Sequence, residues 1–315
     1  MDNNTSFWVI FNAIIVILLI LDLAVFNRKS HEVKMKEALL WSAFWIFLAL
    51  VFNYFIYLYY IPPDGGTSTD AAFKFLTGYL VEKSLSVDNL FVFVLVFTYF
   101  SVPARYQHKV LFWGILGAIF FRAIFIFAGI ALIKEFAFMI YIFGAFLIFT
   151  GVKIAFEKDK KLEPEKNPIL RLFKRFMKVI PEYHGDKFFV RIKGLLYATP
   201  LFVVLIIIET TDVIFAVDSI PAILAITTDP FIVYSSNIFA ILGLRALYFA
   251  LAGLVKLFHF LNYGLAFILI FIGVKMVINH YFGKSVIPVE TSLIVILGTL
   301  LLSILLSLKF PKKEV

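Results

Sequence analysis

The feature that most constrains this chain is a recurring apolar block about twenty residues long. Hydrophobic residues make up 62% of the 315 residues and charged residues only 16%, against roughly 45–50% and about 25% in a soluble domain. A helix of about twenty apolar residues is long enough to cross a bilayer core of roughly 30 Å. The blocks therefore predict an all-α, polytopic membrane protein with about nine transmembrane helices.

The whole chain, residues 1–315, is expected to be one membrane domain. The predicted spans lie near residues 7–26, 38–60, 75–100, 110–133, 136–153, 196–225, 232–254, 259–279 and 291–308. The first block has no basic n-region and no small-residue cleavage site, so we interpret it as a retained helix and not as a signal peptide.

Lysine and arginine gather in segments that would all lie on one side of a nine-span bundle. These segments are residues 27–37, 101–109, 154–195 and 309–313. Residues 61–72 and 226–231, between other spans, hold Asp but no Lys or Arg. We expect the protein to lie in the cytoplasmic (inner) membrane. Because basic loops stay in the cytoplasm, its N-terminus should be on the outer side of this membrane and its C-terminus in the cytoplasm. The net charge of +8 then reflects orientation in the membrane, not nucleic-acid binding.

The basic loop 154–195 contains an amphipathic segment at residues 168–180. Leu172, Phe173, Phe176 and Ile180 share one helical face, while Arg171, Lys174, Arg175 and Lys178 lie largely on the other. Two interpretations stay open: a short helix lying on the membrane surface, or a helix packed against the bundle.

Two parts of the chain resemble each other. Residues 82–89 (Glu-Lys-Ser-Leu-Ser-Val-Asp-Asn) match residues 212–219 (Asp-Val-Ile-Phe-Ala-Val-Asp-Ser), and Gly-Val-Lys recurs at 151–153 and 273–275. The matches divide the chain into a three-helix unit at 75–153 and a second unit at 196–279, with flanking helices at 7–60 and 291–308. Because each unit has an odd number of spans, the second would run through the membrane in the opposite direction, as in many secondary transporters.

Carboxylates inside the predicted spans are the strongest functional signal. They are Glu82, Asp88, Glu209, Asp212 and Asp218. Each charged residue at a helix centre costs about 2.5–3.5 kcal/mol on insertion scales. Ion pairing with Lys83, Arg122 and Arg245 would neutralise three acids at most, which leaves at least two for a cation or for protons.

Helical spacing groups these acids with polar neighbours. Glu82, Ser86 and Asn89 fall on one face of their span, and Glu209, Asp212 and Ser219 form a matching stripe. The expected metal ligands are Glu82, Asp88, Asn89, Glu209, Thr211, Asp212, Asp218 and Ser219. An all-oxygen set of this kind suits hard cations such as Mg²⁺, Ca²⁺ or Mn²⁺. The chain has no Cys, and its five His fall in loops or at span ends, which disfavours a zinc site of nitrogen and sulfur ligands.

Two further expectations concern Asp218, one from the backbone beside it and one from its position in the repeat. Pro221 cannot donate a hydrogen bond to the carbonyl of Val217, so we expect local unwinding of that span beside Asp218. Asp88 and Asp218 occupy equivalent repeat positions. A pseudo-two-fold axis in the membrane plane would bring them toward each other.

At these residues the sequence resembles the TerC family of integral membrane proteins, and in particular its Alx-type manganese exporters. Residues 75–91, 209–222 and 237–246 carry the resemblance. It implies a protein that moves Mn²⁺ out of the cytoplasm, with Glu82, Asp88, Asp212 and Asp218 as its acidic motif residues. It also implies a link to alkaline, manganese or tellurite stress. Mn²⁺ would be the transported ion, and no prosthetic group is expected.

Two functions follow as hypotheses. The leading one is a secondary transporter that exports Mn²⁺ in exchange for protons. The alternative is a membrane scaffold of a metal or tellurite stress-response complex without transport of its own. An enzyme is not expected, because the sequence lacks His-Glu-x-x-His, Gly-x-Ser-x-Gly and Walker A motifs.

Overall fold

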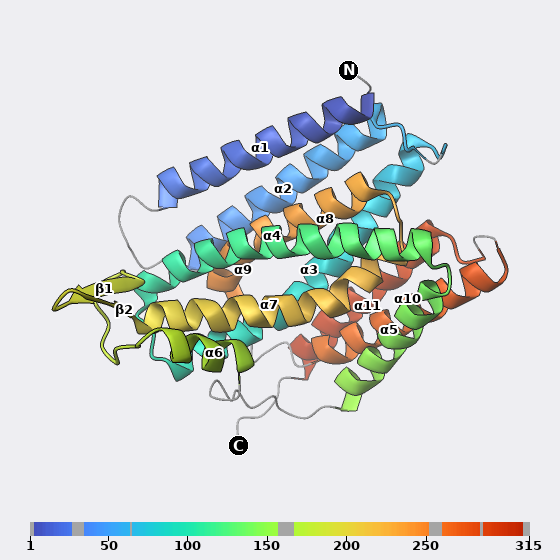
Figure 1. Cartoon of the computed structure of the whole chain (residues 1–315). Helices are drawn as coiled ribbons and strands as arrows, with labels where there is room; N and C mark the ends of the chain where they lie inside the picture. The colour runs from blue at the N-terminus through green and yellow to red at the C-terminus, as the bar shows by residue number, and fades with distance from the viewer. Residues whose placement is uncertain are drawn as a thin grey trace.

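The computed structural model of the chain describes residues 3–26, 35–63, 65–156, 167–251, 260–283 and 286–310. Within these residues the chain forms helices and one β-hairpin (Figure 1). The elements are α1 (Asn3–Phe26), α2 (Met35–Tyr59), α3 (Ser68–Tyr99), α4 (Ala104–Glu135), α5 (Met139–Phe156), α6 (Pro168–Phe176), β1 (Phe189–Ile192), β2 (Leu195–Ala198), α7 (Pro200–Leu224), α8 (Pro230–Leu242), α9 (Leu244–Leu251), α10 (Leu261–Tyr281) and α11 (Val289–Lys309).

The prediction of an all-α polytopic membrane protein is confirmed. Among the described residues, seven stretches are long and apolar enough to cross a membrane: α2, α4, α5, α7, α8 with α9, α10 and α11. The helix α1 is apolar over the shorter stretch Thr5–Leu21. The 32 residues of α3 fall outside this set because any 18-residue stretch of the helix contains Glu82 and Lys83 together with Asp70 or Asp88.

Helix α3 can carry these charges because other helices cover it. It packs against α2, α7, α8, α9, α10 and α11, and Figure 1 shows it running through the middle of the bundle. Phe75 and Leu90, near the two ends of its covered part, are both 0% exposed. Between them the polar residues Thr77, Glu82, Ser84, Ser86 and Asn89 are buried as well, so these side chains face protein and not lipid.

Helices α3 and α7 run antiparallel along each other. A Cβ on Gly78 would touch Ile223, while Asn89, further along α3, donates a hydrogen bond to Asp212 at 3.5 Å. Residues near the end of α3, such as Phe97, share a hydrophobic cluster with Leu201 at the start of α7. Residue numbers thus rise along one helix as they fall along the other, so the two acidic motifs lie face to face.

Helices α5 and α10 touch through glycines. A Cβ on Gly151 would lie 2.7 Å from the carbonyl oxygen of Ala266, and one on Gly273 would lie 2.7 Å from the carbonyl oxygen of Gly144. Small residues allow such close backbone contact between membrane helices. Both glycines belong to the Gly-Val-Lys sequences that recur in the chain, so the two sequences meet on one helix pair.

The predicted span 232–254 corresponds to the apolar stretch Pro230–Ala250, but its helix is interrupted. A single turn residue, Gly243, separates α8 from α9. Lys83 Nζ donates to the carbonyl oxygen of Ala240 at 3.2 Å, which in an unbroken helix would accept from the N–H of Leu244. A Cβ on Gly243 would lie 2.6 Å from this same ammonium. The break therefore frees a backbone acceptor inside the bundle, and Lys83 occupies it.

The predicted span 196–225 begins too early. Its first residues belong to β2, which pairs antiparallel with β1 through a turn whose two residues, Lys193 and Gly194, have φ of 50° and 81°. Two successive positive φ values are typical of the tight hairpin turn that fits twisted strands. The helix α7 starts only at Pro200, a favoured residue for a first helical position.

The prediction that the helix unwinds locally at Pro221 is wrong. The helix α7 continues through Pro221 to Leu224. Proline removes one hydrogen bond to the preceding turn. Here that loss falls in the last turn of the helix, where Ile220, Ala222 and Ile223 are all buried. Packing around the proline keeps the backbone helical.

The short helix α6 packs against the bundle on one of its faces. Asn167 caps it by accepting from the N–H groups of Ile169 and Leu170, both at 3.0 Å. Leu170 is buried, and the ring of Phe173 lies 5.2 Å from that of Phe202 in α7. The packing interpretation is therefore confirmed for this face. The predicted helix over 168–180 is too long, because α6 ends at Phe176 and Ile180 donates its backbone N–H to the carbonyl of Ala198.

Candidate functional site

A fully buried arginine lies near the middle of α4 and gathers polar groups from three other helices. The Nη1 of Arg122 donates to Oε1 of Glu82 on α3. It also donates to the hydroxyl of Ser219 on α7 and the side-chain oxygen of Asn237 on α8, both at 3.2 Å. The guanidinium thus ties α3, α7 and α8 to α4.

The other edge of the guanidinium faces a second carboxylate. Arg122 Nε lies 3.5 Å from Oδ2 of Asp212, and Nη2 lies 3.4 Å from its Oδ1. Asn89 donates to the same carboxylate at 3.5 Å, and Ser86 donates to Glu82 at 3.4 Å. We call this set the Arg122 cluster: Glu82, Ser86, Asn89, Arg122, Asp212, Ser219 and Asn237.

Every member of the Arg122 cluster is buried; Glu82 and Arg122 are 1% exposed and Asp212 is 4% exposed. Two carboxylates and one guanidinium carry a formal charge of −1 when all are ionised. A buried charge is strongly unfavourable unless it is paired and hydrogen-bonded. Arg122 provides this compensation from a position between the two acids.

Four of the eight predicted ligands come together in this cluster: Glu82, Asn89, Asp212 and Ser219. The prediction that Glu82, Ser86 and Asn89 share one face is confirmed. Within the described parts of the chain, no group of three or more His, Cys, Asp or Glu side chains is arranged to hold a metal ion. The space between the two carboxylates is taken by the guanidinium.

Asn237 is a cluster residue that the ligand prediction missed. It is 0% exposed and both accepts from Arg122 and donates to the carbonyl of Val233, at 3.1 Å. A polar signal was present in the sequence, because Ser235, Ser236 and Asn237 interrupt an otherwise apolar block.

Glu209 lies one helical turn before Asp212, outside the Arg122 cluster. Its carboxylate lies against Gly117 of α4, and a Cβ at position 117 would collide with the carboxylate oxygens. Its Oε2 is buried and accepts no hydrogen bond within the described part of the chain. Thr211, another predicted ligand, donates its hydroxyl to the carbonyl of Ile207 at 2.7 Å.

The two remaining predicted ligands are Asp88 and Asp218. The Asp218 carboxylate is half-buried and accepts from Thr150 of α5 at 3.3 Å. It lies away from the Arg122 cluster, because six residues separate it from Asp212 and turn it about 240° around the helix. The side chain of Asp88 lies outside the described residues, so the expectation that the two aspartates face each other stays a prediction.

The proposed pairing of basic residues with the acids holds for Arg122. Lys83 instead donates to Ala240 at the α8 break. Arg245, in α9, is 6% exposed and lines a pocket that also reaches Asp212.

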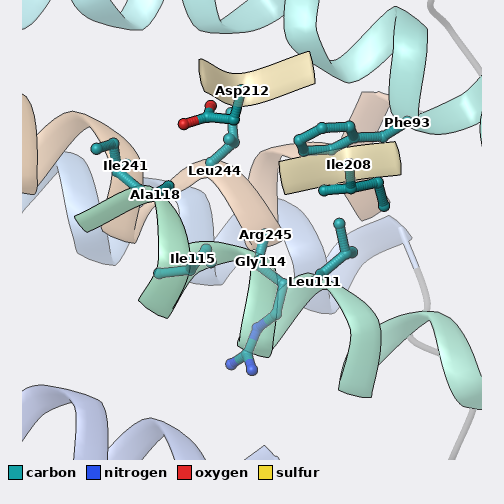
Figure 2. A pocket seen from close by; sticks show the side chains of 10 residues that line it. All are labelled: Phe93, Leu111, Gly114, Ile115, Ala118, Ile208, Asp212, Ile241, Leu244 and Arg245. Carbon is teal, nitrogen blue, oxygen red and sulfur yellow. The ribbon is translucent and has the colours of Figure 1, made fainter. Parts of the chain in front are cut away.

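This small pocket lies between α3, α4, α7, α8 and α9 (Figure 2). It is lined by Phe93, Leu111, Gly114, Ile115, Ala118, Ile208, Asp212, Ile241, Leu244 and Arg245. Asp212 and Arg245 are the charged residues among these ten. Both charged residues therefore border one small, mostly apolar pocket inside the bundle.

Comparisons with known proteins agree on one family. The sequence model of the "Integral membrane protein TerC family" matches residues 67–315. An uncharacterized membrane protein of Myxococcus xanthus is 50% identical over 97% of this chain and 93% of its own length. The protein named "Putative membrane-bound redox modulator Alx" in Escherichia coli (strain K12) is 49% identical over 95% of this chain and 93% of its own length. No solved structure matches the chain significantly.

Proposed function

The chain belongs to the TerC family of integral membrane proteins, and from this premise we propose that it is a secondary transporter that exports Mn²⁺ from the cytoplasm in exchange for protons. The observation that supports the proposal most is the Arg122 cluster, in which Glu82 and Asp212 share one guanidinium inside the bundle. Ionisable residues within membrane helices commonly mark ion pathways.

The cluster offers a divalent cation the ligands that it prefers. Two carboxylates, the side-chain oxygen of an amide and a hydroxyl group are oxygen donors suited to Mn²⁺. Mn²⁺ would neutralise both carboxylates, whereas Arg122 neutralises one. The cation and the guanidinium thus compete for the same oxygens. The nearby Glu209, with a buried oxygen that accepts no hydrogen bond from the described residues, would receive Arg122 when the cation displaces it.

The contacts also support an inverted repeat of three helices each. In the proposed repeat, Glu82 corresponds to Asp212 and Asn89 to Ser219. The contact of Asn89 with Asp212 then maps onto Ser219 with Glu82, and these two side chains share Nη1 of Arg122. Because α3 and α7 run antiparallel, a pseudo-two-fold axis between them would relate the two contacts, as at the central sites of many transporters.

We propose nine spans, with the N-terminus outside and the C-terminus in the cytoplasm. Two spans beyond the seven apolar ones would be α1 and α3. The basic stretch around α6 and the lysines after α11 would then both lie on the cytoplasmic side. A C-terminal reporter active only outside the cytoplasm tests this arrangement, and activity there would contradict it.

Transport can be tested with purified protein in vesicles that contain a Mn²⁺-quenched dye. The unchanged chain should carry Mn²⁺, while Glu82→Gln and Asp212→Asn should abolish or strongly weaken transport at matched protein levels. Asp70→Asn is the matched control, because Asp70 lies in the first turn of the same helix and pairs with Lys74 at 3.7 Å. Normal transport by both cluster variants would contradict the site.

A second candidate function is that of a membrane scaffold in a stress-response complex, and the Escherichia coli relative is named a redox modulator rather than a transporter. The present chain contains no cysteine, so thiol redox chemistry in such a complex would have to come from a partner protein. Vesicles in which the unchanged chain carries no Mn²⁺, together with an unaltered manganese content in cells lacking the chain, would favour the scaffold.

A further inference from the structure

The amphipathic helix α6 has more apolar surface than its packing uses. At 100° per residue, Leu170 and Phe173 point toward the bundle. Ile169, Leu172 and Phe176 form an adjacent strip and are 50%, 53% and 83% exposed. Packing against the first turn of α7 does not require this second apolar strip.

A basic face lies opposite the exposed strip. Lys174 and Arg175 in α6, and Lys178 two residues after the helix ends at Phe176, are all exposed, and none forms an ion pair with another residue in the described ranges. Residues 167–181 include no Asp or Glu. The helix therefore presents two surfaces of different chemistry on opposite sides, one apolar and one positively charged.

The position of α6 fits the boundary between a bilayer and water. Its Phe173 contacts Phe202, which lies in the first turn of α7, and α7 is one of the helices that can cross a membrane. Figure 1 shows α6 beside the N-terminal turns of α7 and not beyond their end. The helix thus lies at the level where a transmembrane span begins.

We propose that α6 binds the anionic phospholipids of the adjacent leaflet. The strip of Ile169, Leu172 and Phe176 lies among the acyl chains. The basic side chains of Lys174 and Arg175, with Lys178 just after the helix, bind headgroup phosphates. Helices with this division of faces lie in the membrane interface, and basic clusters beside membrane spans are attracted to anionic lipid. A protein partner is less suitable, because three apolar residues on one short helix provide far less than the roughly 800 Å² per side of a stable interface. The proposal does not depend on the transported ion.

The absence of cysteine from the chain makes a depth measurement direct. Single variants Phe176→Cys, Lys174→Cys and Glu182→Cys of the full chain would be spin-labelled and reconstituted in vesicles of zwitterionic lipid with phosphatidylglycerol. We expect the label at 176 to collide more with oxygen than with a water-soluble nickel chelate, and those at 174 and 182 to show the reverse. Equal nickel access at 176 and 182 would overturn the proposal. Shielding of 176 from both reagents would overturn it in favour of a protein cover.

Lipid selectivity needs a separate measurement on the purified chain in detergent. Each basic residue near an anionic surface strengthens binding about fivefold, so replacing Lys174, Arg175 and Lys178 by Gln should weaken phosphatidylglycerol binding by roughly a hundredfold. The matched control replaces Lys187, Arg191 and Lys193, near and in the β-hairpin, with the same change in net charge. A retained affinity in the α6 variant, or equal losses in both variants, would show that α6 is not the binding surface.

Discussion

The ammonium group of Lys83 lies 3.2 Å from the carbonyl oxygen of Ala240, inside the bundle and at the break between α8 and α9. Helix termini leave backbone carbonyls without partners, and no water reaches such groups in the hydrocarbon region of a bilayer. Lys83 from α3 supplies the missing donor. A charged residue inside a predicted span thus has a structural role that does not involve an acid.

Replacement of Lys83 by Met should therefore destabilise the fold. The carbonyl of Ala240 would lose its donor, and a buried polar group without a partner costs about 1–3 kcal/mol. The loss should be seen as a lower midpoint of unfolding in detergent. Lys74→Met on the same helix is the control, because Lys74 pairs with a partly exposed Asp70 and such pairs contribute about 1 kcal/mol or less. Equal losses in the two variants would contradict the capping role.

The glycine contact between α5 and α10 predicts a position-specific effect of alanine. In Gly151→Ala and in Gly273→Ala the new Cβ would lie 2.7 Å from a backbone oxygen of the other helix. The two helices must therefore separate. Overpacking of this kind costs roughly 1–3 kcal/mol or more. Gly298→Ala in α11 is the control, since its Cβ would meet nothing within 4 Å. Unfolding midpoints that do not differ among the three variants would show that the contact is not tight.

The sequence predicted the apolar helices well, because span length and apolar composition follow directly from the thickness of a bilayer. It also predicted that Glu82 and Asp212 are buried acids and that Arg122 pairs with carboxylates. It did not predict the break at Gly243, since the lysine that makes this break possible lies 160 positions away in the sequence. The β-hairpin was hidden because Leu195 and Leu196 continue the apolar pattern of the following helix.

The details of the candidate site were less predictable for a similar reason. Motif spacing places Asp218 in the same repeat position as Asp88, yet the contact of Asp218 with Thr150 depends on how α5 packs against α7. Asn237 joins the Arg122 cluster only because α8 crosses α4 at this level. Such contacts are set by tertiary packing and not by the local pattern.

Removing the charge of Arg122 should prevent stable folding, and removing the acids as well should restore part of it. Arg122→Leu leaves Glu82 and Asp212 buried without their common partner, and breaking a buried pair costs about 3–5 kcal/mol. The triple variant Arg122→Leu, Glu82→Gln, Asp212→Asn should recover folded protein in size-exclusion chromatography. The control Lys134→Leu alters an exposed cation of the same helix. An Arg122→Leu protein that folds at the normal level would contradict the pairing role.

An exposed ion pair outside the membrane predicts a small effect at acid pH. A hydrogen bond from Lys109 at 3.0 Å lowers the pKa of Asp186 below its ordinary value, against a smaller opposing effect of burial. Because the folded pKa is lowered, the pair stabilises the protein above the unfolded pKa of about 3.9, and the stabilisation is lost as the pH falls through the folded pKa. Asp186→Asn should cost less than about 1 kcal/mol at pH 7. The difference in stability between Asp186→Asn and the unchanged chain should shrink as the pH falls through the lowered pKa of Asp186. A difference that stays constant as the pH falls would contradict the assignment.

The proposed competition between Arg122 and the transported cation predicts an unusual effect of a conservative change. Arg122 reaches both carboxylates because its guanidinium donates from several nitrogens at once, whereas a lysine ammonium acts as a single compact charge. In Arg122→Lys the two acids should be held less firmly, so Mn²⁺ should bind the purified protein more tightly, by roughly tenfold or about 1.4 kcal/mol.

Transport by the Arg122→Lys variant should nevertheless slow, because the weaker internal cation no longer displaces Mn²⁺ effectively from Glu82 and Asp212. Isothermal calorimetry with Mn²⁺ and vesicle flux measured on the same preparation separate the two effects. The control is Arg105→Lys, at the start of the same helix, where the guanidinium lies 4.8 Å from the ring centre of Tyr106. If Arg122→Lys weakens Mn²⁺ binding, Arg122 helps the cation to bind and does not compete with it. If binding and flux both match the unchanged chain, the guanidinium and the cation use different oxygens.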